Sequence, residues 1–124
     1  MLTSMQRLAI SLALCLSCIT AWGQEYYVYH LIDPRNGEIF YVGKGKDYRA
    51  KDHKREAKEV KEKYSAKEKR IRELLRAGYE PKIDKVMLFD CEAEALRFER
   101  EEIERIGKDN LTNVLRGTKT TKGC

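Results

Sequence analysis

The chain has 124 residues, which is enough for one domain with its own core and too short for a second independent one. Hydrophobic residues make up 42% and charged residues 36% of the sequence, a balance that favours a globular protein over a disordered or membrane one. The net charge of +5 permits a polyanionic partner without identifying one.

Charge is unevenly distributed along the chain. Residues 44–85 contain 16 Lys or Arg against 9 Asp or Glu, whereas residues 90–106 contain 7 acids and 3 bases. Solvated helices with i,i+4 ion pairs would explain most of these side chains one by one. As a group, the basic stretch is a candidate surface for phosphates.

The first 23 residues have the pattern of a signal peptide. An apolar run over residues 8–19 follows Arg7, and Ala21 and Gly23 are small residues ahead of a possible cleavage site. The run is short for a transmembrane helix, although a retained anchor and an upstream start codon are alternatives. We expect a secreted or periplasmic protein if the segment is a true signal peptide, and a cytoplasmic protein otherwise.

The four cysteines divide between two parts of the chain. Cys15 and Cys18 would leave with the signal peptide, whereas Cys91 and Cys124 would remain. In an oxidising compartment the remaining two could form a disulfide, and two free thiols are an equally good interpretation.

A β-hairpin is the first expected element. Residues 26–32 are rich in aromatic and β-branched side chains, and residues 39–42 form a second such run. The Asp-Pro-Arg-Asn-Gly segment at 33–37 has strong turn chemistry, so the two runs should pair antiparallel. The Gly-Lys-Gly-Lys run at 43–46 is expected to end the second strand.

Two helices are expected next. Asp47 is a candidate N-cap for a charged helix running towards Lys61. Ser65 and Glu68 have the spacing of a capping box for a second helix, which Gly78 closes. The apolar stripe of this second helix consists of Ile71, Leu74 and Leu75.

A third strand over residues 82–89 and a last helix over residues 91–106 complete the expected elements, with Asp90 as the cap of that helix and Gly107 at its end. The last helix has a carboxylate in its apolar face, because Glu99 lies between Ala95 and Ile103 at helical spacing. Burying an unpaired carboxylate is costly, so Glu99 should have a cation, a metal or hydrogen-bond donors beside it. An edge position with escape to solvent is the alternative. By the same spacing, Glu94, Glu101 and Glu104 lie off the stripe.

The hairpin is rich in tyrosine. Tyr27, Tyr29 and Leu31 share one face by the strand period of two, and Tyr41 lies on the partner strand. Tyrosines in strands are commonly packing residues, so this pattern alone indicates no chemistry. His30 is likewise interpreted as packing within the hairpin.

In combination, these features resemble the GIY-YIG nuclease family. Tyr27-Val28-Tyr29 matches the first family motif, and Tyr41-Val42-Gly43 matches the second after eleven intervening residues. The resemblance spans about residues 25–117 and is strongest to a bacterial subgroup related to animal LEM-domain nucleases, which cut branched DNA. Further matches are the basic run at 43–46, Arg49, His53, Glu99, Leu111-Thr112-Asn113 and Arg116-Gly117.

Two positions depart from the family pattern. Tyr27 stands where the first motif has glycine, at a strand position rather than at a reacting group. The family arginine falls on Arg49 by the spacing of the subgroup, or on Lys51 by the spacing of other relatives. Arg49 is preferred, since a guanidinium contacts phosphate in a bidentate manner that lysine cannot reproduce.

The resemblance implies a fold and a domain division. The fold would be α/β of the α+β kind, a small three-stranded antiparallel sheet flanked by about three helices. The nuclease domain would cover residues 24–117, between the apolar segment 1–23 and a polar tail at 118–124.

The resemblance also implies roles for the site residues. Glu99 would bind a divalent cation, Mg²⁺ or Mn²⁺. Tyr29 or Tyr41 would take a proton from the attacking water, once cationic neighbours lower the pKa of the phenol. His53 is a second candidate for that proton transfer. Phosphate binding would fall to Arg49 and to Lys44, Lys46 and Lys51, and Asn113 would position Glu99 or a phosphate oxygen.

The function implied by the resemblance is a metal-dependent endonuclease that hydrolyses phosphodiester bonds in DNA, with linear and branched or structured DNA both open as substrates. A nucleic-acid-binding module that keeps the fold without catalysis is one alternative. An exported nuclease effector is another, distinguished by its location rather than its chemistry.

Overall fold

A computed structural model describes residues 25–114 and residue 124. The elements run β1 (Tyr26–Ile32), β2 (Ile39–Lys46), α2 (Arg49–Lys58), α3 (Ala66–Arg76), β3 (Lys82–Phe89), α4 (Glu92–Ile106) and a short 3-10 turn, η2 (Lys108–Asn110). The expected signal peptide, the Arg116-Gly117 motif and most of the polar tail lie outside the described residues. No helix in the described part is long and apolar enough to span a membrane.

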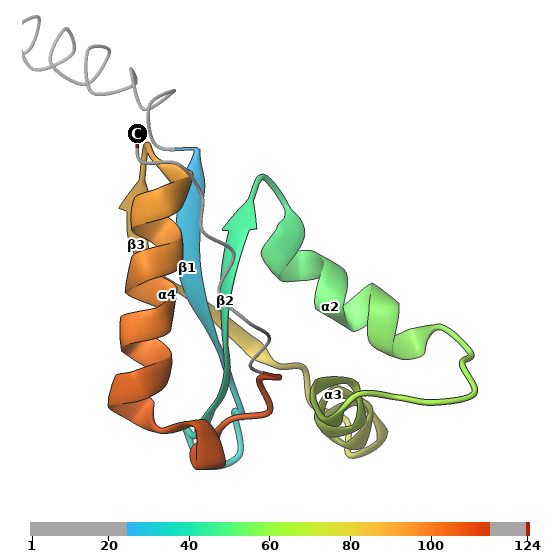
Figure 1. The fold of residues 1–124 in the computed structure, drawn as a ribbon. Helices are drawn as coiled ribbons and strands as arrows, with labels where there is room; N and C mark the ends of the chain where they lie inside the picture. The colour runs from blue at the N-terminus through green and yellow to red at the C-terminus, as the bar shows by residue number, and fades with distance from the viewer. Residues whose placement is uncertain (1–24, 115–123) are drawn as a thin grey trace, which may run out of the picture.

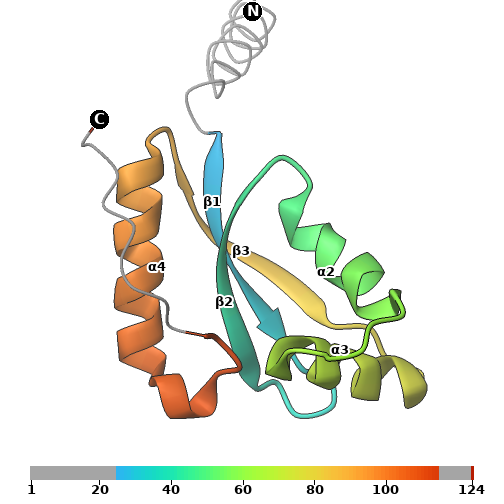
Figure 2. The ribbon, with the colours of Figure 1, turned by 45° about the vertical axis from the view of Figure 1, so that its right-hand side comes forward.

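The three strands form one antiparallel sheet in the order β2-β1-β3. Helix α4 covers one face of the sheet, and α2 and α3 lie on the opposite face (Figure 1). The turned view in Figure 2 shows the same three layers, with α2 and α3 on the side of the sheet away from α4. The α+β fold expected from the sequence is therefore confirmed.

Each face of the sheet has its own apolar core, because strand side chains alternate between the two faces. On the α4 side, Val28 and Val42 pack against Ala95 and Ile103. On the α2 and α3 side the core is larger and more aromatic, and it comprises Tyr27, Tyr29, Leu31, Phe40, Ala50, Ala57, Ile71 and Leu74. The predicted shared face of the hairpin tyrosines is thus confirmed.

The hairpin loop is tied to α3 through a buried carboxylate. Asp33 is fully buried, and its carbonyl oxygen accepts a hydrogen bond from the backbone amide of Gly37 at 2.8 Å. Its carboxylate accepts hydrogen bonds from Arg35 and, at 3.1 Å, from Arg70 of α3. Hydrogen bonding to Arg35 is the main reason that the pKa of Asp33 lies well below its usual range. The predicted turn is therefore also linked to α3, through the hydrogen bond between Asp33 and Arg70.

The glycine-rich run does not end the second strand, contrary to the expectation from sequence. β2 continues to Lys46, with Gly43 opposite Tyr29 and Gly45 opposite Tyr27. The two tyrosine rings lie over these two residues, so that the strand requires glycine there. These glycines therefore leave room for the tyrosine rings within the sheet and do not end the strand.

One predicted helix start is confirmed and two are wrong. Ser65 and Glu68 form the predicted capping box of α3. Asp47 does not cap α2, because it has a left-handed backbone conformation (φ 54°) and the N-cap residue is Tyr48. The helix also ends at Lys58, before the expected limit. Asp90 lies one residue before the N-cap of α4, which is Cys91.

Cys91 and Cys124 are joined by a disulfide, with their Cα atoms 5.9 Å apart. The structure therefore favours pairing over the two free thiols that the sequence left equally open. The bond anchors the last residue of the chain at the start of α4.

Candidate active site

Glu99 is half-buried within α4, between the buried residues Ala95 and Ile103. Burial raises the pKa of the Glu99 carboxyl, and the ammonium and backbone amide of Lys44 oppose that shift. The glutamates predicted to lie off the stripe are all exposed: Glu94, Glu101 and Glu104. Glu99 is thus a carboxylate in an apolar helix face, as its spacing indicated, and Lys44 lies beside it.

Two tyrosines and a histidine meet on the opposite face of the sheet. The ring centroids of Tyr29 on β1 and Tyr41 on β2 are 6.2 Å apart, and the His53 ring of α2 lies 5.6 Å from Tyr29 and 5.1 Å from Tyr41. The Tyr29 hydroxyl and Nε2 of His53 share a hydrogen bond. Tyr29 is 1% and His53 2% exposed, so this bond is shielded from water. The fold therefore brings together three predicted site residues from three elements.

The phenols of this tyrosine cluster are not acidified. Burial is the main cause of a raised pKa at both Tyr29 and Tyr41, and for Tyr41 the Glu99 carboxylate adds to the effect. Arg49 lowers both pKa values, but burial outweighs it. The expectation that cationic neighbours bring a phenol towards neutrality is wrong, because these rings have been taken out of water. Both hydroxyls carry their protons at neutral pH.

His53 is the group in the cluster that is ready to accept a proton. The pKa of His53 is lowered to about 4, mainly by burial and in addition by the cations of Lys67 and Arg49. The imidazole is therefore neutral at pH 7. Its Nδ1 lies 3.8 Å from Oε2 of Glu56 and has no hydrogen-bond partner among the described residues. With the proton on Nδ1, Nε2 accepts the hydrogen bond from Tyr29.

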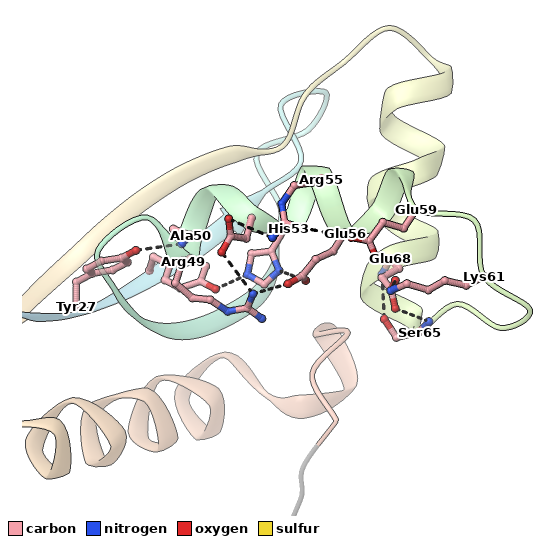
Figure 3. A network of polar contacts seen from close by, with 12 residues as sticks. Tyr27, Arg49, Ala50, His53, Arg55, Glu56, Glu59, Lys61, Ser65 and Glu68 are labelled. Carbon is pink, nitrogen blue, oxygen red and sulfur yellow. Dashed lines mark hydrogen bonds and ion pairs between the residues drawn. The ribbon is translucent and has the colours of Figure 1, made fainter.

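Arg49 lies at the tyrosine cluster, whereas Lys51 does not. The Arg49 guanidinium pairs with Glu56 beside His53 (Figure 3). It also lies 3.9 Å from Oδ2 of Asp52. It is also close enough to Tyr29 and Tyr41 to act on their pKa values. The Lys51 ammonium instead lies 5.8 Å from the ring centroid of Tyr48. Of the two candidates for the family arginine, Arg49 is therefore the one that lies beside Tyr29 and Tyr41.

Two charged residues at this site were missed by the sequence reasoning. Lys67 of α3 is half-buried, with its Nζ atom 4.9 Å from the ring centroid of Tyr41. Nothing in the sequence indicated that the first turn of α3 would lie against β2. Glu56 was detectable, because it follows Arg49 by two helical turns and His53 by one on the same face of α2.

The residue at the glycine position of the first motif has a structural role. The Tyr27 hydroxyl donates to the carbonyl of Asp47 at 2.8 Å and accepts from the backbone amide of Ala50 at 3.0 Å. Both bonds hold the start of α2 against β1. Tyr27 therefore helps to position Arg49 and His53, which lie on α2.

The predicted phosphate-binding residues differ in their positions. Lys44 lies near Glu99 and pairs with Glu92 at 2.6 Å. Lys46 lies further along β2, 3.4 Å from Glu25. The Asn113 amide bonds to the backbone of Val42 in both directions, at 3.0 Å and 2.7 Å, rather than to Glu99. Asn113 thus supports β2 where the strand leads into the glycine-rich run.

The donor set for a metal is small. The described residues contain no group of three or more His, Cys, Asp or Glu side chains that could enclose an ion. Glu99 nevertheless fits a cation, since burial raises the pKa of its carboxyl and Lys44 only partly compensates. A single carboxylate would leave most ligand positions of a hard divalent ion to water and phosphate oxygens.

Comparison with known families agrees with this arrangement. The model of the LEM-3-like GIY-YIG domain matches residues 26–123. No curated protein and no solved structure matches the chain. GIY-YIG domains are endonuclease domains, and the match covers 98 of the 124 residues, from the first tyrosine motif to the C-terminal tail. The chain therefore belongs to the GIY-YIG nuclease family, in its LEM-3-like group.

Proposed function

We propose that this protein is a metal-dependent endonuclease that hydrolyses phosphodiester bonds in DNA, including branched or structured DNA. One observation carries the proposal: a neutral histidine is hydrogen-bonded to a motif tyrosine beside Arg49, and the half-buried Glu99 acts on the same tyrosines from the other side of the sheet. Hydrolysis needs a proton acceptor, a cation for the phosphate and stabilisation of the leaving oxygen.

Proton transfer would run through Tyr41 and Tyr29 to His53. As water attacks the phosphorus atom, it passes its proton to the hydroxyl of the partly exposed Tyr41. Tyr41 passes its own proton to Tyr29, to which it is hydrogen-bonded, and Tyr29 passes its proton to Nε2 of His53. Neither phenol thus needs to exist as a free anion, which is consistent with their raised pKa values. The low pKa of His53 keeps it unprotonated before the reaction. Glu56 is placed to stabilise the imidazolium that results.

The cations of the site have separate tasks. Arg49 would bind the phosphate, since it is 43% exposed and its partners Glu56 and Asp52 leave part of the guanidinium open to solvent. Lys67 would add positive charge next to Tyr41. Glu99 would hold Mg²⁺ or Mn²⁺, which when bound supplies Lewis-acid stabilisation of the leaving oxygen.

The location proposed is outside the cytoplasm. The apolar N-terminal segment motivated this expectation, and the Cys91–Cys124 disulfide supports it, because such bonds persist in oxidising compartments. An exported nuclease would catalyse the same reaction as a cytoplasmic one, but outside the cytoplasm. Expression with a periplasmic fractionation would test the location independently of activity.

Nicking of supercoiled plasmid by the purified chain tests the activity, with Mg²⁺, with Mn²⁺ and with chelator. Glu99→Gln and Arg49→Ala should each lower the rate by about 100-fold or more. Glu101→Gln, an exposed change on the same helix, is the matched control and should cut normally. Binding of plasmid and branched DNA without cleavage under any metal would overturn the proposal and favour the non-catalytic binding module.

A further inference from the structure

A second hollow surface lies between α2 and β3. Two adjoining cavities, of about 290 Å³ and about 640 Å³, share Ala50, Lys51 and Ile83 in their walls. We call their union the α2–β3 groove. Its apolar part is formed mainly by Leu31, Ala50 and Ile83, and its ends by Pro81 and Tyr48.

The groove exists because the helices cover only part of the sheet. The core between the sheet and helices α2 and α3 is built on β1 and β2. Most side chains of the edge strand β3, which Figure 2 shows beside β1, are exposed. Ile83 lies opposite Leu31, and Lys85 lies opposite Tyr29, which places both on the side of the sheet where α2 and α3 lie. Ile83 is 36% exposed, so part of its apolar side chain is open to solvent in the groove.

The charges around the groove are mixed, and two of its lysines are available. Lys54 is paired with Glu80. In the described part of the chain, Lys51 and Lys85 make no ion pair, and each lies over a tyrosine ring instead: Lys51 over Tyr48 and Lys85 over Tyr27, with 4.3 Å from Nζ to the ring centroid in the second case. Positive charge is therefore available beside an apolar floor.

Tyr48 is the most exposed aromatic ring of the groove, with 75% of its surface open to solvent. It is the N-cap residue of α2, so its backbone is fixed while its ring face remains accessible. An exposed aromatic ring next to unpaired lysines is the combination that stacks a base and binds the adjoining phosphate.

We infer that the α2–β3 groove binds an unpaired segment of the nucleic-acid substrate, with a base on Tyr48 and phosphates at Lys51 and Lys85. The inference rests on the proposed nuclease function. A duplex presents phosphates rather than base faces to such a surface, so it would not use the floor around Ile83, whereas unpaired bases would. The groove also adjoins the active site, since His53 lines it and bonds to Tyr29.

The test measures binding of fluorescent single-stranded DNA and RNA oligonucleotides to the full chain in chelator, by anisotropy. Tyr48→Ala and the double variant Lys51→Ala/Lys85→Ala should each weaken binding about tenfold, in line with the loss of one stacked base or two phosphate contacts. Lys58→Ala, an exposed change at the far end of α2, is the control. Nicking of fully paired plasmid should persist in Tyr48→Ala and in Lys58→Ala.

A fluorescent reporter makes the contact visible. Tyr48→Trp in a Trp22→Phe background leaves one tryptophan in the chain, at the proposed stacking position. Addition of the oligonucleotide should quench its emission. Unchanged affinity in the groove variants, or no quenching of Trp at position 48 by a bound oligonucleotide, would overturn the inference even if the enzyme cuts DNA. Absence of cleavage with Tyr48-dependent binding intact would instead overturn the proposed nuclease activity alone.

Discussion

The ring of Tyr29 lies directly over the backbone of Gly43. A Cβ atom at residue 43 would be 2.5 Å from Cζ and from the hydroxyl oxygen of Tyr29, a separation that real side chains do not have. Gly43 is the last residue of the second family motif, and Tyr29 the last of the first. The two motifs thus specify one packed pair, which directs the Tyr29 hydroxyl towards His53.

Gly43→Ala should therefore damage both stability and activity. The added methyl group must displace the buried Tyr29 ring, at a cost of about 1–3 kcal/mol in the free energy of unfolding. Because His53 depends on the position of that ring, nicking should fall by at least about tenfold. Urea denaturation and the plasmid assay measure the two effects.

A double-mutant cycle separates this steric effect from a general weakening of the strand. In a Tyr29→Ala background the space over residue 43 is free, and Gly43→Ala should cost much less stability than in the wild type. Equal costs in the two backgrounds would show that the contact with Tyr29 is not the cause.

The local elements could be predicted from the sequence where local chemistry determines them. The capping box at Ser65, the bounds of β3 and the half-buried carboxylate at Glu99 follow from patterns within one or two helical turns or one strand. The continuation of β2 through Gly43 could not be predicted in this way, because glycine ordinarily disfavours strands. Glycine is needed at this position because the ring of Tyr29, on the neighbouring strand, lies over it.

The pieces of the site that depend on tertiary contacts were not predictable in the same way. Lys67 approaches Tyr41 only because α3 packs beside α2, and no spacing within the sequence contains that information. The sequence also predicted the wrong direction for the pKa shift of Tyr29, which is raised rather than lowered. The charged residues near Tyr29 can be counted in the sequence, but the burial of its ring is known only from the fold. Burial has the larger effect on the pKa of Tyr29.

His53 should make the stability of the protein depend on pH in a defined window. Its pKa is lowered from 6.5 to about 4 in the folded state, so between these values the unfolded chain binds more protons. Stability is then complete above about pH 6.5 and falls as the pH decreases towards 4. Urea midpoints of the wild type and of His53→Gln, measured across this range, should differ in slope. Parallel curves for the two proteins would contradict the low pKa.

Lys67→Met should shift the pH dependence of catalysis rather than merely reduce it. The Lys67 ammonium lowers the pKa of His53, after the larger effect of burial. Without that charge the pKa of His53 rises, so the acidic limb of the kcat/KM profile should move to higher pH. Lys69→Met, an exposed change on the same helix, should leave the profile unchanged. A uniform loss of rate with no shift would assign Lys67 a packing role only.

Cys124→Ser tests the contribution of the disulfide to stability. The bond closes a loop with a sequence separation of 33 residues, for which chain entropy gives a stabilisation of about 3–4 kcal/mol. Removing it should lower the urea midpoint accordingly, and dithiothreitol should lower the wild-type midpoint by the same amount while leaving the variant unchanged. A wild type whose urea midpoint does not change with reductant would mean that the two thiols do not pair in solution.

If the shift appears, a reducing cytoplasm would deprive this small domain of a large part of its stability, because domains of this size have only about 5–15 kcal/mol in total. The same measurement therefore bears on where the protein works.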